Sequence, residues 1–189
     1  MSAQFWNLVE PEHRRVRAFC RKLAGDRHNG DDLYQDSLVR ALTGFGSLKT
    51  REAFRPWLYR IVINRYKSRV RGSFWKRFVP LTTEIAEQTG GPDPAALHNA
   101  RRRLEIAFRA VRPDERALIT LFELQGWPVS ELADLTGKSE GNIKVKLSRI
   151  RKKMRDALSR YLNESAEGEL GNKIFSEDEI CVVTKPEKK

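Results

Sequence analysis

The sequence predicts an all-α fold of two small helical domains joined by a flexible linker. Apolar residues recur at steps of three and four through both halves of the chain, which is the spacing of one helix face. Almost no segment alternates between apolar and polar residues as a half-buried strand would. Between the halves, residues 82–97 lack strong periodicity and contain two Gly and two Pro, a composition typical of a linker.

The expected elements follow from local signals along the chain. In the first half, Asp31 or Asp32 can cap a helix, and Pro56 suits the first turn of another. In the second half, Gly137 suits a turn between helices, and Ser139 is a good N-cap. Helices are therefore expected near 5–24, 31–43, 52–71, 73–78, 95–111, 114–124, 129–135 and 139–161.

These elements divide the chain into a domain at 1–78, a linker at 79–97, a second domain at 98–162 and a tail at 163–189. Each domain is small, so its core is modest. The tail carries seven acids and four Lys, a net charge of 4 − 7 = −3, and this composition predicts disorder.

The overall charge restricts the class of partner. Lys and Arg number 36 against 25 Asp and Glu, a net charge of +11, which favours an anionic partner. A membrane surface is one such partner, but no apolar run approaches the length of a spanning helix and the N-terminus lacks a leader pattern. We therefore expect a cytoplasmic protein with no membrane insertion. Cys20 and Cys181 lack metal-type spacing, so no metal or other cofactor is expected, and Cys20 suits the core.

The segment 139–160 predicts an amphipathic helix with a strongly basic face. Its apolar residues recur at steps of four, three, four and four: Ile143, Leu147, Ile150, Met154 and Leu158. Between Lys138 and Arg160 nine Lys or Arg accompany only Glu140 and Asp156, a net charge of 9 − 2 = +7. A solvated face usually mixes charges of both signs, so this face favours a polyanion.

The residues before this helix sharpen the prediction. PVSELADLTGKSEGNIKVKL, residues 128–147, holds a short helix, a turn at Thr136, Gly137 and Lys138, and the basic helix. This order is typical of a helix-turn-helix, whose second helix enters the major groove of DNA. An ordinary helical hairpin is the alternative, and charge, turn and spacing together favour DNA binding.

In the first half, GDDLYQDSLVRAL at 30–42 places Asp32, Gln35 and Asp36 together on an exposed acidic edge. Clustered carboxylates could hold a magnesium ion. No third carboxylate or nearby His supports a metal, so a solvated acidic face or a protein contact fits better.

The segment REAFRPWLYRIVINRYKSRVRG at 51–72 combines cations with aromatic residues. Such a surface suits phosphates and unpaired bases. Trp57 and Leu58 lie on the face expected to enter the core. The opposite face carries a stripe, for which nucleic-acid binding is the favoured role: Arg60, Asn64, Lys67 and Arg71.

Together these segments resemble the extracytoplasmic-function (ECF) group of bacterial RNA polymerase sigma factors, which has only sigma regions 2 and 4. GDDLYQD at 30–36 is similar to region 2.2, and WLYRIVINRYKSRVR at 57–71 to regions 2.3 and 2.4. The segment 112–155 is similar to region 4. Three motifs occur in the expected order over about 5–162. Ser68, Asn142 and Val145 depart from residues usual in the family, Asp, Thr and Ser, which bears on the promoter sequence.

The resemblance implies a transcription initiation factor with core RNA polymerase, promoter DNA and an anti-sigma factor as partners. Asp32, Gln35 and Asp36 would dock on the largest polymerase subunit. The stripe on 57–71 would bind the −10 element and assist its melting, with the loop 44–50 contributing a pocket for a splayed base. The helix at 139–155 would enter the −35 element, with Asn142 and Val145 at base edges. Its phosphate contacts would be Lys144, Lys146, Arg149 and Lys152.

Other classes remain open. A stand-alone regulator would bind an operator without polymerase and use its first domain to dimerise. A decoy that only titrates an anti-sigma factor would have no use for the cations retained at 60–71 and 144–155. An enzyme is the least supported class, because His13, His28 and His98 are scattered and no pair of nucleophile and base is recognisable.

Overall fold

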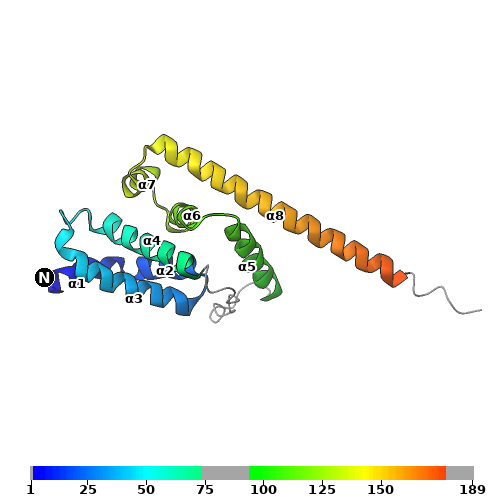
Figure 1. The fold of residues 1–189 in the computed structure, drawn as a ribbon, viewed down its shortest axis with the longest axis horizontal. Helices are drawn as coiled ribbons and strands as arrows, with labels where there is room; N and C mark the ends of the chain where they lie inside the picture. Colours follow the sequence, from blue (N-terminus) through cyan, green and yellow to red (C-terminus); the bar gives the residue numbers. More distant parts are fainter. Residues whose placement is uncertain (1, 74–93, 178–189) are drawn as a thin grey trace, which may run out of the picture.

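The computed structural model describes residues 2–73 and 94–177. Within these ranges the chain is helical with short connections and no strand, so the all-α prediction is confirmed. Figure 1 shows a first bundle formed by α1 to α4 and a second group formed by α5 to α8. The first bundle contains α1 (Ser2–Val9), α2 (His13–Ala24), α3 (Arg27–Gly44) and α4 (Phe54–Ser73). The second group contains α5 (Pro94–Arg109), α6 (Pro113–Gln125), α7 (Val129–Thr136) and α8 (Glu140–Glu177).

Two helix starts in the first bundle differ from the predictions. The expected helix at 5–24 is two helices, α1 and α2, separated by a 3₁₀ turn at Glu10–Glu12. Pro11 lies in this turn, and a proline cannot supply an interior helical hydrogen bond. The prediction that Asp31 or Asp32 caps α3 is wrong, because Asp26 accepts a hydrogen bond from Asn29 N at 2.8 Å and α3 begins at Arg27.

α2 and α3 approach each other closely at Gly30. A Cβ atom placed on Gly30 would lie 2.4 Å from Arg21 Cα, so only glycine allows this approach. Next to it, Asp31 accepts paired hydrogen bonds from Arg17 and from Arg21 at 2.8–2.9 Å. The hydrogen bonds from Arg17 and Arg21 hold the pKa of the Asp31 carboxyl well below its ordinary value. These contacts fix α3 against α2.

The second group is organised around the buried face of α8. Its core side chains are almost fully buried and include Leu121, Leu132, Ile143, Leu147 and Ile150. Gly126 and Gly137 end α6 and α7 with φ angles of 67° and 66°, a backbone conformation that favours glycine.

The far end of α8 differs from the expected boundary. α8 continues through Glu177 as one helix of 38 residues, whereas the sequence predicted its end near 161. The first part of the segment 163–189, for which disorder was predicted, is therefore helical. The helix expected at 73–78 and most of the linker at 79–97 lie outside the described residues, and α5 begins at Pro94.

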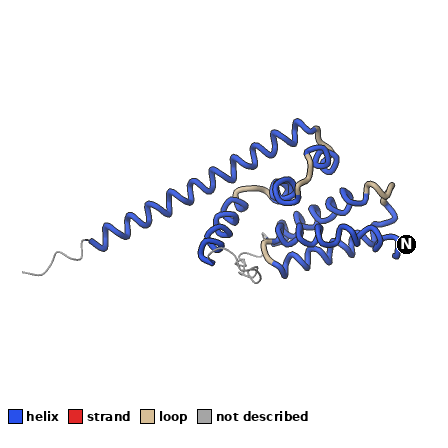
Figure 2. The backbone as a smooth tube through the Cα atoms, turned by 180° about the vertical axis from the view of Figure 1, so that it is seen from behind, coloured by secondary structure: helices blue, strands red, loops and turns tan. Residues whose placement is uncertain are grey.

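The two helical groups lie against each other. α4 contacts α6 and α7, and α2 contacts α6. Figure 2 shows the same arrangement from behind, with the C-terminal part of α8 extending away from the other helices. None of the described helices is long and apolar enough to cross a lipid bilayer.

Candidate functional site

The acidic edge predicted on α3 is only partly free. Asp32 is half exposed, with His28 Nε2 3.7 Å from its carboxylate, and Gln35 is exposed. Asp36 instead accepts hydrogen bonds from Arg65, at 3.0 Å, and from Arg69, both on α4. These hydrogen bonds, that from Arg69 first, lower the pKa of the Asp36 carboxyl. Asp36 therefore ties α3 to α4, while Asp32 and Gln35 remain available to a partner.

Two exposed apolar residues extend this edge. Val39 is 65% exposed and Leu42 is 40% exposed. They follow Asp32 and Gln35 at steps of four and three, so the four residues lie on one side of α3. We call Asp32, Gln35, Val39 and Leu42 the docking stripe. Sequence reasoning missed Val39 and Leu42, although their helical spacing from the acidic motif was a usable signal. A mixed polar and apolar stripe suits a protein contact better than a metal ion.

The four residues predicted to form a stripe on α4 lie on one side of the helix, and one of them, Arg60, is hydrogen-bonded to α7. Asn64 and Arg71 are exposed and Lys67 is partly exposed. Arg60 is exposed as well, but its guanidinium donates to Leu135 O at 3.0 and 3.2 Å and to Asp134 O at 3.3 Å. We call Arg60, Asn64, Lys67 and Arg71 the α4 stripe.

The aromatic side chains of the segment 51–72 are buried or partly buried. Leu58 is fully buried as predicted, whereas Trp57 is only partly buried. Tyr59 and Tyr66 are buried at 0% and 8% exposure, so they pack in the core. Burial raises the pKa of both hydroxyls. Two further aromatic residues that follow this segment, Phe74 and Trp75, lie outside the described residues. Among the described residues, the α4 stripe offers charge and hydrogen bonds more than stacking rings.

The helix-turn-helix is formed by α7, the turn at Gly137 and the start of α8. Asn142 N approaches Ser139 Oγ at 3.4 Å, which supports the predicted N-cap. Ile143 and Leu147 are buried against the rest of the second group. The opposite side of α8 presents exposed residues, including Val145 at 50% exposure: Asn142, Lys144, Val145, Arg149 and Lys152. We call these five residues the α8 face.

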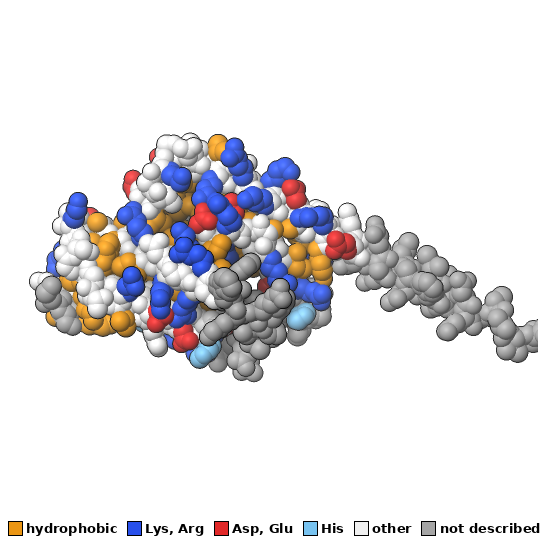
Figure 3. Space-filling view, viewed as in Figure 1, with side chains coloured by type: hydrophobic (Ala, Val, Ile, Leu, Met, Phe, Trp, Pro, Cys, Tyr) orange, Lys and Arg blue, Asp and Glu red, His pale blue; other side chains and the backbone are white. Residues whose placement is uncertain are grey.

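Lys146 does not belong to the α8 face. Its ammonium donates to Asp114 at 2.9 Å, and its side chain is 24% exposed. Two turns further along α8, Lys153 donates to the buried Glu115 at 2.8 Å. Both ion pairs hold α8 to the start of α6, so Lys146 orients the α8 face. Figure 3 shows Lys and Arg side chains along α8 and over the middle of this side of the molecule, with fewer Asp and Glu among them.

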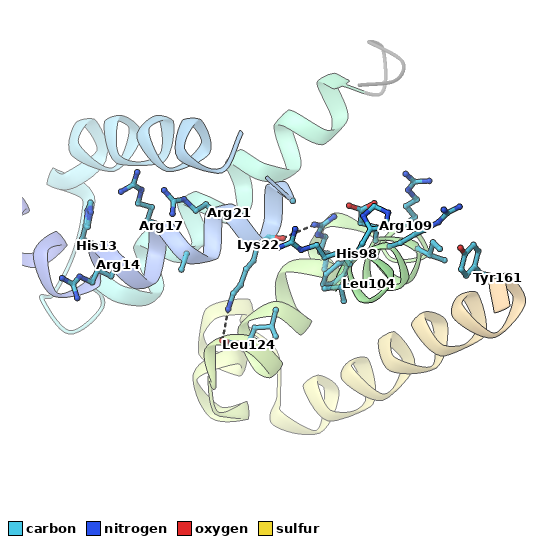
Figure 4. Close-up of a pocket in the computed structure, with 18 residues that line it drawn as sticks. His13, Arg14, Arg17, Arg21, Lys22, His98, Leu104, Arg109, Leu124 and Tyr161 are labelled. Atoms are coloured by element: carbon cyan, nitrogen blue, oxygen red, sulfur yellow. Dashed lines mark hydrogen bonds between the residues drawn. The ribbon is translucent and has the colours of Figure 1, made fainter. Parts of the chain in front are cut away.

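A groove of about 1050 Å³ lies between the two helical groups. Its walls come from α2, α5 and α6 and from Tyr161 of α8 (Figure 4). Leu104 and Leu124 supply exposed apolar surface, and among the described residues Glu105 is the one acid that lines the groove. Its cationic lining residues are Arg14, Arg17, Arg21, Lys22, Arg101, Arg102, Arg109 and Arg116.

Within the described residues, no group of three or more His, Cys, Asp or Glu is placed to hold a metal ion. Cys20 is fully buried, as predicted, and burial raises the pKa of its thiol to about 12. Cys181 lies outside the described residues.

Comparisons with known proteins agree with this arrangement. Residues 8–75 match the family model of sigma-70 region 2, and residues 101–154 match that of sigma-70 region 4. The chain is 28% identical to the ECF RNA polymerase sigma factor SigM of Mycobacterium tuberculosis, over 84% of this chain and 79% of SigM. It is 27% identical to the RNA polymerase sigma factor CarQ of Myxococcus xanthus, over 82% of this chain and 88% of CarQ.

Two solved structures share the fold. The sigma factor RpoE of Bartonella quintana, solved with the anti-sigma factor NepR, superimposes with a TM-score of 0.64 and 23% identity, over 82% of this chain and 97% of that one. CnrH, solved with the cytosolic domain of CnrY, gives a TM-score of 0.59 and 20% identity, over 85% of this chain and 90% of that one. The region 2 match includes the α4 stripe, and the region 4 match includes the α8 face. The chain therefore belongs to the sigma-70 family as an ECF-group transcription initiation factor with regions 2 and 4.

Proposed function

We propose that the chain binds core RNA polymerase through the docking stripe and places the polymerase on promoters through the α8 face and the α4 stripe. The α8 face enters the major groove of the −35 element. The α4 stripe binds the −10 element and assists its melting. The chain acts in the cytoplasm as a binding protein, and the polymerase supplies the catalysis.

The observation that carries this proposal is the division of α8 into two faces. Ile143 and Leu147 fix one side in the core, and Lys146 and Lys153 pair with carboxylates on α6. The other side presents the α8 face to solvent with cations beside Asn142 and Val145. Such a helix can place phosphate contacts and base contacts at the same time. A Val145 methyl suits the methyl group of thymine.

An anti-sigma factor is a further proposed partner. The sigma factor RpoE was solved with the anti-sigma factor NepR, and CnrH was solved with the cytosolic domain of CnrY. In this chain the groove between the two helical groups joins a basic rim to apolar surface at Leu104 and Leu124. An amphipathic segment with acidic residues would match both properties.

Run-off transcription with core polymerase and a promoter library tests the central proposal. We expect transcripts only when the chain and core polymerase are both present, from promoters that share two sequence elements. Tight operator binding by the chain without polymerase, with no transcript from any promoter, would instead identify a stand-alone regulator.

Reversing the charge of Asp32 and placing a charge on the apolar part of the docking stripe should abolish polymerase binding. We expect Asp32→Lys with Val39→Glu to prevent co-purification with core polymerase, because both side chains are exposed and neither holds the fold together. Asp36 is left intact, since its loss would strand Arg65 and Arg69. Glu52→Lys is the matched control, because Glu52 is an exposed acid outside the stripe. Normal co-purification of the double variant would show that polymerase docks elsewhere.

The cations of the α8 face should strengthen DNA binding equally for all DNA sequences, because they contact phosphates. The logarithm of the affinity of holoenzyme for DNA falls linearly with the logarithm of the salt concentration. We expect Lys144→Ala, Arg149→Ala and Lys152→Ala each to reduce the magnitude of this slope by about one unit. Lys146→Ala should leave the slope unchanged, because the Lys146 side chain is only 24% exposed and pairs with Asp114 of α6, whereas Lys152 is 71% exposed. The measurement is affinity for promoter DNA across a series of salt concentrations. If all three α8-face variants kept the slope of the unsubstituted chain, this face would be removed from the DNA contact.

A further inference from the structure

Asp36 lies between the two surfaces that the first bundle presents to its proposed partners. On α3 it follows Asp32 by four residues and Gln35 by one, so it borders the docking stripe. Its carboxylate faces α4, where Oδ2 accepts hydrogen bonds from Arg65 at 3.0 and 3.2 Å and from Arg69. One acidic residue therefore joins the helix that carries the docking stripe to the helix that carries the α4 stripe.

Arg65 and Arg69 influence how α4 is turned about its own axis. They are four residues apart and share one side of α4, and at 100° per residue the α4 stripe lies on nearly the opposite side. Arg69 also donates to Asn29 O on α3 at 3.4 Å. When α3 binds these two guanidinium groups, the α4 stripe is turned away from α3.

The charged contacts between α3 and α4 are more directional than the apolar ones. Leu58 and Val62 are fully buried and anchor α4 in the core of the first bundle. Burial of apolar surface is non-directional, whereas a hydrogen bond weakens steeply when its donor and acceptor are misaligned. The contacts of Asp36 are therefore more sensitive to a rotation of α4 than the apolar contacts are.

The strength of these contacts depends on what covers them. The side chains of Asp36, Arg65 and Arg69 are 38%, 38% and 33% exposed. Water screens ion pairs at this exposure, so the contacts are weak in the free chain. A partner on the docking stripe removes water beside Asp36, and the lower local dielectric strengthens the attraction between the charges. The three groups are already paired, so covering them costs less than covering unpaired charges.

From these contacts we infer that Asp36 is a positioning residue for promoter opening, which couples polymerase docking on α3 to the orientation of the α4 stripe through Arg65 and Arg69. Asp36 acts through α4 and is not itself a docking contact. This role differs from the docking role that the family resemblance implies for Asp36. It rests on the proposed functions of the docking stripe and of the α4 stripe.

The variant Asp36→Asn tests the charge of this residue. Asparagine keeps the shape and one acceptor oxygen, so Arg65 and Arg69 lose only the charge of their partner. Asp31→Asn is the matched control, because Asp31 lies on the same helix and also accepts from two arginines, both of which belong to α2. Each full-length variant is measured for thermal unfolding, for affinity to core polymerase and, at saturating polymerase, for permanganate reactivity of thymines in the −10 element.

We expect Asp36→Asn to lower opening of the −10 element about tenfold, because hydrogen bonds to a charged acceptor are about twice as strong as neutral ones. Its affinity for core polymerase should stay within about twofold of that of the unsubstituted chain. Asp31→Asn should lower the unfolding temperature and leave opening unchanged. Arg69→Gln should also lower opening, and adding it to Asp36→Asn should cause no further loss, because the two residues act through one contact.

Four results would overturn the inference. Normal opening by Asp36→Asn would remove Asp36 from positioning, and weaker binding to core polymerase in the same variant would make it a docking contact. Equal losses of stability and of opening in Asp36→Asn and Asp31→Asn would leave Asp36 as a structural ion pair only. Less opening by the double variant than by Asp36→Asn alone would mean that Arg69 acts independently. A separate failure, no opening of any promoter by the unsubstituted holoenzyme, would instead refute the proposed role of the α4 stripe.

Discussion

Holoenzyme assembled with Asn64→Ala, Lys67→Ala and Arg71→Ala should bind its promoter as a closed complex and fail to open the −10 element. The three side chains are exposed or partly exposed on one side of α4, so they can follow a single strand. If each contact supplies about 1 kcal/mol to the opened strand, the loss of three lowers opening by about 100-fold. Permanganate reactivity of unpaired thymines measures the opening directly. Arg60 is left in place because its guanidinium donates to Leu135 O on α7, so its loss would also remove a contact within the fold.

The control removes the same net charge elsewhere in region 2. Arg15→Ala with Arg27→Ala takes away two exposed cations outside the α4 stripe. We expect this variant to open the −10 element normally, and both variants to unfold at the same temperature as the unsubstituted chain. Full thymine reactivity in the stripe variant would exclude α4 from melting.

Gly30→Ala should cause the largest loss of stability of any single methyl group added to region 2. The new Cβ would lie 2.4 Å from Arg21 Cα and 2.9 Å from Arg21 N, both backbone atoms. Because neither atom can rotate away, α2 and α3 must separate, and Asp31 would lose its alignment with Arg17 and Arg21. We expect a cost of about 3 kcal/mol or more, a large share of the total for a small domain. Urea denaturation of the full chain measures the change.

Gly72→Ala provides the comparison for Gly30→Ala. Gly72 lies near the end of α4, and a Cβ there meets nothing within 4 Å. An alanine favours the helix over a glycine, so we expect Gly72→Ala to be neutral or slightly stabilising. Equal destabilisation by both substitutions would show that α2 and α3 tolerate a wider spacing.

Local signals were sufficient to predict the helices of region 4. Gly126 and Gly137 punctuate the chain where α6 and α7 end, and Ser139 marks the start of α8, so those boundaries agree within one or two residues. The division of α8 into a buried and an exposed side also followed from the spacing of its apolar residues. These features depend on neighbours in the sequence.

The pairings of charged residues could not be predicted in the same way. Asp36 and Lys146 have the spacing of surface residues, yet each pairs with a residue far along the chain. The engagement of Arg60 by Leu135 depends on how two separate groups of helices meet, which no local pattern contains. Local periodicity therefore placed these side chains on the correct helices and left their partners unknown.

The unbroken length of α8 gives region 4 the geometry of a lever. The recognition residues occupy its first turns, and 38 residues at 1.5 Å per residue make a rod of about 57 Å. A tilt of 10° about the DNA-facing end would displace the far end by about 10 Å, provided that the helix stays straight. A small reorientation in the major groove is thus magnified at Glu177. A probe attached near that end would measure angular changes of the recognition helix that are too small to detect at the promoter.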